Sequence, residues 1–312
     1  SSLVATMIVV SGLMLAPGFD IASAQGRRDR VVSLLGEELP PSPLPSEIQA
    51  AMEAKLAAAQ EDYLADPQSA EATIWMGRRL AYLGRYGEAI EIYTRGIENH
   101  PEDARMYRHR GHRFITTRQL DRAIVDLAHA ADLIAGTEDQ VEPDGLPNVL
   151  GIPTSTLQSN IWYHLGLAYY LQGDLESALR AYRDCLKVSR NPDMLVATSH
   201  WLYMTLRRLK REAEAVALLQ PIHAEMDIIE NTSYHRLLLM YKGDLTAEGL
   251  LDEAQAAGGL ENATLGYGIG NWHAYNGRPK QAESIFRTIL KGQQWAAFGY
   301  IAAEADVARS GV

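Results

Sequence analysis

The sequence predicts an all-α solenoid of about six stacked helix pairs, and three observations lead to this fold class. The composition favours helices over sheets, since Ala, Leu, Arg and Glu are abundant and only four Phe occur in 312 residues. A small residue followed four positions later by a larger apolar one recurs at a nearly fixed interval. Glycines fall at matching places in the same register. One such unit cannot bury its apolar face alone, so neighbouring units must stack.

The recurring motif belongs to the second helix of each expected pair. Its alanines are separated by 34, 55, 35, 34 and 35 residues. The first helices show the same interval, because Gly77, Gly111 and Gly166 are 34 and 55 residues apart. Small residues let two helices approach closely, and the large residue fills the adjoining groove. The six pairs are Ala89/Tyr93, Ala123/Leu127, Ala178/Tyr182, Ala213/Ala217, Ala247/Leu251 and Ala282/Phe286.

The period and the residues that carry it resemble the tetratricopeptide repeat. The third unit is most similar to that family, through Trp162-x-x-Leu165-Gly166-x-x-Tyr169, then Gly173-Asp174, then Ala178-x-x-x-Tyr182. The first, second and last units carry shorter parts of the pattern. The fourth and fifth depart from it, because bulky residues near Trp201 and His235 replace the small residue of the first helix. The resemblance implies a right-handed superhelix with capping helices and a concave groove lined by first helices.

The repeat and the breaks in composition divide the chain into seven segments. We expect a signal peptide at 1–24, a Pro-rich tether at 25–46, an N-terminal capping helix at 47–69, units 1 and 2 at 70–135, an inserted loop at 136–157, units 3 to 6 at 158–292 with units 4 and 5 degenerate, and a C-terminal capping helix at 293–312. Prolines at 40, 41, 43 and 45 exclude a helix in the tether. The long interval carries 21 extra residues with three prolines, so we expect a loop that is either functional or mobile.

The N-terminal segment predicts export. Residues 3–15 form an apolar run about as long as the hydrophobic region of a signal peptide, and too short for a comfortable membrane span. Ala22-Ser23-Ala24 provides a small-x-small cleavage site, so cleavage after Ala24 is expected. The expected location is periplasmic or secreted, without stable membrane insertion after cleavage. An uncleaved anchor is the alternative.

Charge and residue content exclude several classes of function. The net charge of −10 argues against nucleic-acid binding, which requires a surplus of Lys and Arg. The single cysteine, Cys185, excludes an intrachain disulfide and a cysteine cluster for zinc. His109 and His112 are spaced as H-x-x-H, but they lack the carboxylate of a zinc motif and are flanked by arginines. Neither a metal nor another cofactor is therefore expected.

Three further features are interpreted as packing. The glycines of Gly266-Tyr267-Gly268-Ile269-Gly270 lack the strand and the Lys-Ser/Thr of a phosphate loop, and the last one falls on the small position of the repeat. Cys185 also occupies a position where a small packing residue belongs. Trp201 and Trp272 favour core packing, with an aromatic partner surface as the alternative.

The candidate site lies on the concave face that the family resemblance implies. In the second unit, Arg105, Arg108 and His112 are spaced i, i+3, i+7 on one helical face. Guanidinium groups suit carboxylates, which indicates an anionic ligand. The alternative is a solvated helix face whose arginines are balanced by neighbouring acidic residues. The expected partner-binding residues are Arg78, Tyr82, Arg105, Arg108, His112, Asn160, Tyr163 and Tyr170.

Family members that bind chaperone tails use a Lys/Asn/Arg clamp, but Ile74 stands at its Lys position, so that kind of recognition is not predicted. The leading hypothesis is an exported, non-enzymatic scaffold that binds a protein or peptide partner with an acidic segment. One alternative is an enzyme or enzyme-accessory protein with its site at the 136–157 loop. Another is a structural component of an envelope assembly, for which self-association is expected.

Overall fold

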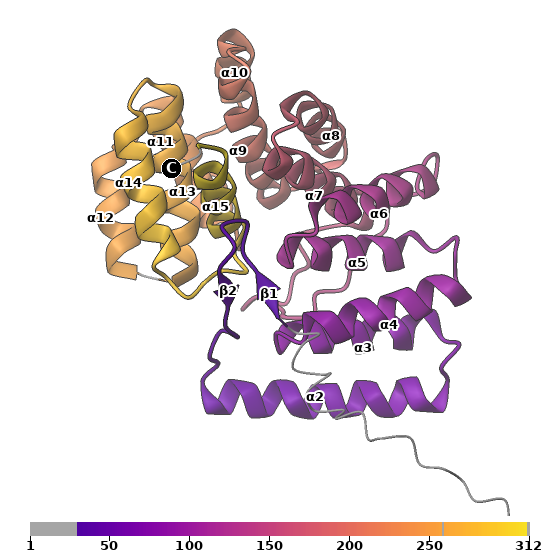
Figure 1. The fold of residues 1–312 in the computed structure, drawn as a ribbon. Helices are drawn as coiled ribbons and strands as arrows, with labels where there is room; N and C mark the ends of the chain where they lie inside the picture. Colours follow the sequence, from indigo (N-terminus) through magenta and orange to yellow (C-terminus); the bar gives the residue numbers. More distant parts are fainter. Residues whose placement is uncertain (1–29, 258, 311–312) are drawn as a thin grey trace, which may run out of the picture.

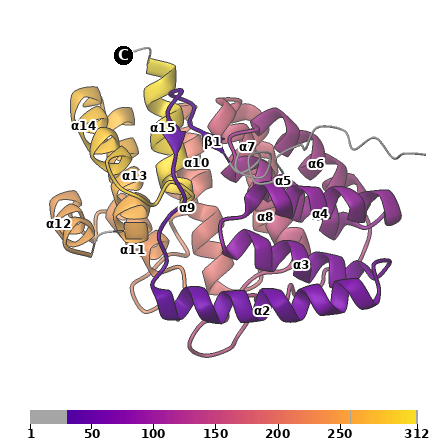
Figure 2. The same ribbon diagram turned by 60° about the horizontal axis from the view of Figure 1, so that its bottom comes forward.

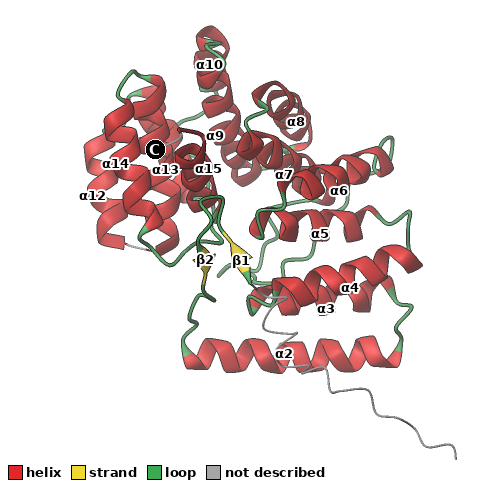
Figure 3. Cartoon of the chain, in the orientation of Figure 1, coloured by secondary structure: helices red, strands yellow, loops and turns green. Residues whose placement is uncertain are grey.

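The structure, a computed structural model, describes residues 30–257 and 259–310. These residues form fourteen α-helices and one two-stranded hairpin, so that helix dominates the regular structure (Figure 3). The predicted all-α solenoid is confirmed, because helices packed on one another follow in a curved array (Figure 1). No helix in the described ranges is long and apolar enough to cross a membrane. The predicted signal peptide at 1–24 lies outside the described residues.

The elements follow a simple order along the chain. The hairpin of β1 (Val31–Val32) and β2 (Glu38–Leu39) comes first and is antiparallel, with Val31 opposite Leu39. Helix α2 (Ser46–Ala65) then packs on α3, as the predicted capping helix should. The packed pairs are α3 (Ala70–Tyr82) with α4 (Tyr86–Asn99), α5 (Ala104–Thr116) with α6 (Leu120–Leu133), α7 (Leu157–Gln172) with α8 (Leu175–Val188), α9 (Pro192–Arg208) with α10 (Glu212–Leu218), and α13 (Gly259–Tyr275) with α14 (Pro279–Leu290). In the fifth unit α11 (Thr232–Lys242) packs on α9 and α13, and α12 (Ala247–Ala257) packs on α13. Helix α15 (Phe298–Ser310) follows them.

Polar side chains cap the first helices of units 1 to 4, namely α3, α5, α7 and α9. The Asp103 side chain accepts the backbone N–H of Arg105 at 3.0 Å and caps α5. Thr156 and Ser159 cap α7 reciprocally, with Thr156 Oγ1 accepting the Ser159 N–H at 3.1 Å. Each cap satisfies a backbone donor that the helix itself leaves unpaired. The caps therefore help to fix where α5 and α7 begin.

Close glycine contacts hold the two helices of four pairs together. A Cβ atom at Gly166 would lie 2.7 Å from ring carbons of Tyr182, and one at Gly111 would lie 2.7 Å from the Leu127 Cγ. Such distances leave no room for a methyl group, so the helices approach more closely than any other residue would allow. The packing role predicted for the small and large residues is confirmed. The contacting pairs are Gly77/Tyr93, Gly111/Leu127, Gly166/Tyr182 and Gly270/Phe286.

The fourth unit differs from the predicted register. Ala213 and Ala217, expected to pack, are both exposed, whereas Ala215 is completely buried. Alanines occupy positions 213, 215 and 217 of a seven-residue helix, so spacing alone cannot tell which of them faces α9. In the fifth unit Ala247 is buried as predicted, but Leu250 is buried more deeply than Leu251. Both misplacements fall in the units that lack the family's small first-helix residue.

The segment predicted as a tether is docked against the other end of the chain. The Leu34 backbone N–H donates to Glu304 Oε1 at 2.6 Å, and Trp295 Nε1–H donates to the Pro40 carbonyl at 2.5 Å. The hairpin and α15 lie side by side in both views (Figure 2). Within the predicted Pro-rich tether at 25–46, the backbone at Leu34 and Pro40 is therefore held by residues more than 200 positions away.

Helix α15 turns back into the array instead of only covering its last pair. It packs on α13 and α14, and it also contacts α7 in the middle of the chain. Its Glu304 forms an ion pair with Arg118 at 2.8 Å, and both side chains are almost fully buried. Arg118 also donates to the Trp295 carbonyl at 2.8 Å. The second unit, the N-terminal hairpin and the C-terminal helix thus meet at one buried ion pair.

Candidate functional site

The inner side of the array holds a cavity of about 660 Å³, here called the inner cavity. It lies where α5 faces the start of α11, the middle of α13 and the segment that leads into α15. Its volume falls in the range of ordinary ligand sites. The lining residues are His112, Glu230, Asn231, Thr232, Ser233, Tyr234, Thr264, Ala296, Ala297 and Phe298.

A smaller cavity of about 120 Å³, the basic cavity, adjoins it, and His112 lines both. The basic cavity lies between α3, α5 and the inserted loop, and its wall contains three arginines and one carboxylate. Its lining residues are Arg78, Ala81, Tyr82, Tyr93, Arg108, His109, His112, Arg113 and Glu142.

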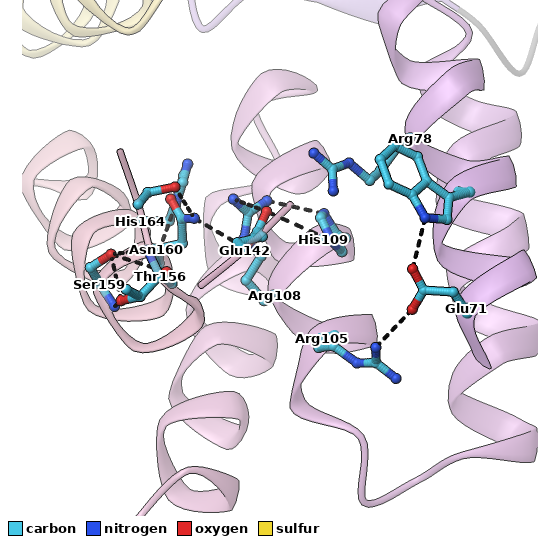
Figure 4. A network of polar contacts seen from close by, with 12 residues as sticks. Glu71, Arg78, Arg105, Arg108, His109, Glu142, Thr156, Ser159, Asn160 and His164 are labelled. Carbon is cyan, nitrogen blue, oxygen red and sulfur yellow. Dashed lines mark hydrogen bonds and ion pairs between the residues drawn. The ribbon is translucent and has the colours of Figure 1, made fainter. Parts of the chain in front are cut away.

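Arg108 is the most buried of the three arginines, with 7% of its surface exposed. Its Nη2 lies 2.9 Å from Glu142 Oε1, and its Nη1 donates to His109 Nδ1 at 3.0 Å. The other Glu142 oxygen accepts a hydrogen bond from Asn160 Nδ2 at 3.0 Å. Figure 4 shows Glu142 between Arg108 and Asn160, joining α5 to α7. The Arg108 Nε is buried and has no hydrogen-bond partner among the described residues.

Arg78 and Arg113 face the same cavity without a carboxylate of their own. Arg78 Nε donates to the Tyr82 hydroxyl at 3.2 Å, and its guanidinium lies over the Trp75 ring. Arg113 lies over the Tyr86 ring at 5.4 Å from the centroid. In the part of the chain that the structure describes, neither arginine forms an ion pair. The basic cavity therefore contains more positive than negative charge.

Three histidines around this charge are held in the neutral form. Burial lowers the pKa of His109, His112 and His164 well below the usual value, and the nearby positive arginines lower it further. Consistent with this, His109 Nδ1 accepts a hydrogen bond from Arg108, and His164 Nδ1–H donates to the Asn160 carbonyl at 2.6 Å. Burial also lowers the pKa of Arg108. These shifts show that positive charge is already costly here.

The inserted loop supplies the only carboxylate in this wall, and it is anchored at several points. The Glu142 backbone N–H donates to the Ser155 carbonyl at 3.1 Å. Farther along the loop, Asn148 and Thr154 donate to Glu230 at 2.8 and 2.6 Å. Glu230 itself lines the inner cavity. The loop thus connects the walls of both cavities.

The structure brings some of the predicted site residues together and separates others. Arg78, Tyr82, Arg108 and His112 line the basic cavity, and Asn160 holds its carboxylate. Arg105 lies apart, paired with Asp103 at 2.6 Å and Glu71 at 3.0 Å, as the solvated-face alternative expected for it.

Tyr163 and Tyr170 are buried and do not line either cavity, which corrects their predicted place in an open groove. The Tyr163 hydroxyl donates to that of Tyr234 at 3.2 Å, and the Tyr170 hydroxyl is 2.8 Å from that of Tyr267. The later helices α11 and α13 fold over this part of α7. Such a contact between distant units is not encoded in a repeat period, which describes only neighbours.

Among the charged residues and histidines of the wall, the sequence reasoning missed Glu142, His109 and Arg113. One signal could have found them. Helix α5 carries four arginines and two histidines but no acidic residue, so its charge must be balanced from elsewhere. Glu142 lies in a loop, where no helical spacing indicates its direction.

The remaining motifs behave as packing groups. Cys185 is completely buried, and burial raises its pKa to about 11, which disfavours the reactive thiolate. Gly268 and Gly270, both in α13, lie against Leu237 of α11 and Phe286 of α14, which confirms their packing role. Trp201 is buried among aromatic rings, including that of Tyr267. No cluster of three or more potential metal ligands occurs in residues 30–257 and 259–310.

Known proteins resemble this chain in part. Solved structures with a similar helical array include YrrB, a TPR protein with an unusual peptide-binding site (13% identity, TM-score 0.44, covering 75% of this chain and 91% of that one). Another is pilF of Pseudomonas aeruginosa (14% identity, TM-score 0.45, covering 78% and 84%). We draw no functional conclusion from likenesses at this level. No curated protein sequence matches the chain.

One family model matches part of the sequence. It is described as "Tetratricopeptide repeat", and it matches residues 159–192, which cover α7 and α8. This is the third unit, the one whose glycine and aromatic residues follow the family pattern most closely. The chain therefore contains a tetratricopeptide repeat, as predicted from that unit.

Proposed function

We propose that the chain is an exported scaffold that binds a protein or peptide partner on the inner side of its helical array. The observation that carries this proposal is the inner cavity of about 660 Å³ beside the positively charged basic cavity. A preformed cavity between packed helices lowers the ordering cost of binding. The excess of guanidinium groups favours a partner with an acidic segment.

The inner cavity also offers backbone donors. Helix α11 begins there, and no side chain caps its first N–H groups. Helix N-termini attract negative charge, as do the arginines of the adjoining basic cavity. The periplasmic or secreted location and self-association remain part of the proposal.

The test is affinity capture from an envelope extract with the mature chain as bait. Ser233→Trp places a large side chain in the inner cavity, whereas Ser284→Trp, on the exposed face of α14, serves as the matched control. We expect wild type and Ser284→Trp to retain the same partner and Ser233→Trp to lose it. Equal capture by all three chains would contradict a site on the inner side.

A further inference from the structure

We propose that the basic cavity binds a phosphate group, either on a side chain of the partner or as free phosphate. The inference deepens the proposed function and rests on it where the phosphate belongs to the partner. Its evidence is the charge balance, the hydrogen bonding and the size of the cavity. In Figure 4 Arg78 reaches from α3 toward Arg108, His109 and Glu142.

The first argument is the charge balance. Three guanidinium groups, Arg78, Arg108 and Arg113, face one carboxylate, Glu142, and the lining histidines are neutral. The wall therefore has a net charge of about +2 at neutral pH, since arginine stays protonated. A phosphate monoester has a charge of about −1.5 to −2, whereas a carboxylate would leave one positive charge unbalanced.

The second argument is the unused hydrogen-bonding capacity. The Arg108 side chain is buried, with 7% of its surface exposed, and its Nε–H has no acceptor in the described chain. In the same described residues neither terminal nitrogen of Arg78 has a hydrogen-bond acceptor, and its Nε donates to the Tyr82 hydroxyl. Buried donors of a charged group are normally paired. Guanidinium groups bind phosphate oxygens through two parallel N–H bonds, which this wall can supply.

The third argument is size and access. A volume of about 120 Å³ has room for roughly four water-sized groups, which is the size class of a phosphate group. His112 is shared with the inner cavity, and Tyr82 and Arg113 at the wall are only partly buried. A phosphate group on a segment bound in the inner cavity can therefore reach the arginines.

Glu142 acts in this arrangement as an internal anion. It occupies one guanidinium, that of Arg108, and leaves the other two to the ligand. Removing its charge makes the cavity more positive, so Glu142→Gln should destabilise the chain without ligand and bind phosphate more tightly. A purely structural ion pair would show only the first effect.

The experiment titrates the purified chain with inorganic phosphate by calorimetry, at constant ionic strength set with chloride. We expect wild type to bind, and Arg78→Gln/Arg113→Gln to bind at least about tenfold more weakly, because two charge-assisted pairs are lost. Arg105→Gln is the matched control, since Arg105 lies on the same helix but pairs with Asp103 and Glu71 outside the cavity. Equal affinity in the double variant and wild type would overturn the proposal, as would the absence of binding at millimolar phosphate.

Thermal unfolding provides a second readout if a variant folds poorly. Phosphate should raise the Tm of Glu142→Gln more than that of wild type. Glu304→Gln breaks another buried Arg–Glu pair, with Arg118, away from the cavity, and phosphate should raise its Tm no more than that of wild type. An equal rise in the two variants, beyond that of wild type, would refute a specific site.

The source of the phosphate is resolved by a third titration. A short phosphoserine peptide that binds at least about tenfold more tightly than inorganic phosphate assigns the site to a phosphorylated partner; equal affinity assigns it to free phosphate. The titrations use no partner, and the capture test uses no added phosphate. Failure of the titrations with successful capture would therefore reject this inference alone.

Discussion

At the scale of single residues, the inner helices hold histidines in an environment that opposes protonation. His109, His164 and His200 are all buried. Burial lowers the pKa of His200 to about 3, and burial together with the nearby arginines lowers that of the other two. His200 stacks on Tyr234 and Tyr241, away from the basic cavity.

These pKa values predict a loss of stability in acid. The unfolded chain binds protons on histidine near pH 6.5, whereas the folded chain does so only at lower pH, so the free energy of unfolding falls as the pH drops below about 6.5. Each such histidine contributes about 1.4 kcal/mol per pH unit. His200→Phe should therefore reduce the pH slope by about that amount between about pH 6 and about pH 4, measured by urea unfolding.

Tyr203→Phe is the control for this slope. Tyr203 stacks on Tyr241 in the same aromatic group, so the substitution disturbs the packing without removing a histidine. It should change the free energy of unfolding by a constant amount and leave the slope unaltered. An unchanged slope in His200→Phe would show that this histidine is protonated in the folded chain.

At the scale of the helix pair, the close glycine contacts predict opposite effects for one substitution at two sites. Gly166→Ala should lower the free energy of unfolding by about 1–3 kcal/mol, because the new methyl group overlaps the buried Tyr182 ring. Gly249→Ala should raise it by up to about 1 kcal/mol, because Gly249 is exposed within α12 and meets only the Thr246 hydroxyl. Denaturant titration compares the two variants with wild type. Equal effects would contradict the packing account.

The sequence predicts those elements that are determined by contacts between residues of the same repeat. The interval of 34 or 35 residues locates the helix pairs, because each pair repeats the contact between one small and one large residue. It fails in α10, where three alternating alanines make the facing residue ambiguous. It also cannot place Glu142 or the buried Tyr170, whose partners come from a loop and from α13. The part of the basic cavity that could be predicted is therefore Arg78, Tyr82, Arg108 and His112, which lie on regular helices.

At the scale of the whole molecule, the two ends of the array are joined. Repeat arrays contact mainly their neighbours, so they can unfold from one end. Here Leu34 and Arg118 both contact Glu304, across 270 and 186 positions of sequence. The helices between these contacts form a closed arrangement, and the inner cavity between them stays partly open to solvent.

The closed arrangement predicts cooperative unfolding. Far-ultraviolet circular dichroism and tryptophan fluorescence should give coincident urea transitions for wild type. Glu304→Ala leaves Arg118 buried without its carboxylate, which should cost about 3–5 kcal/mol and separate the two transitions. Separate transitions already in wild type would show that the ends do not stabilise one another.

The central claim, that the partner binds on the inner side of the array, is tested most directly by amide hydrogen exchange of the chain with and without its captured partner. We expect slower exchange at residues 230–234 and 296–298, which line the inner cavity, and no change along the outer helices α4, α6 and α8. Protection confined to those outer helices, with unchanged exchange at 230–234, would contradict it.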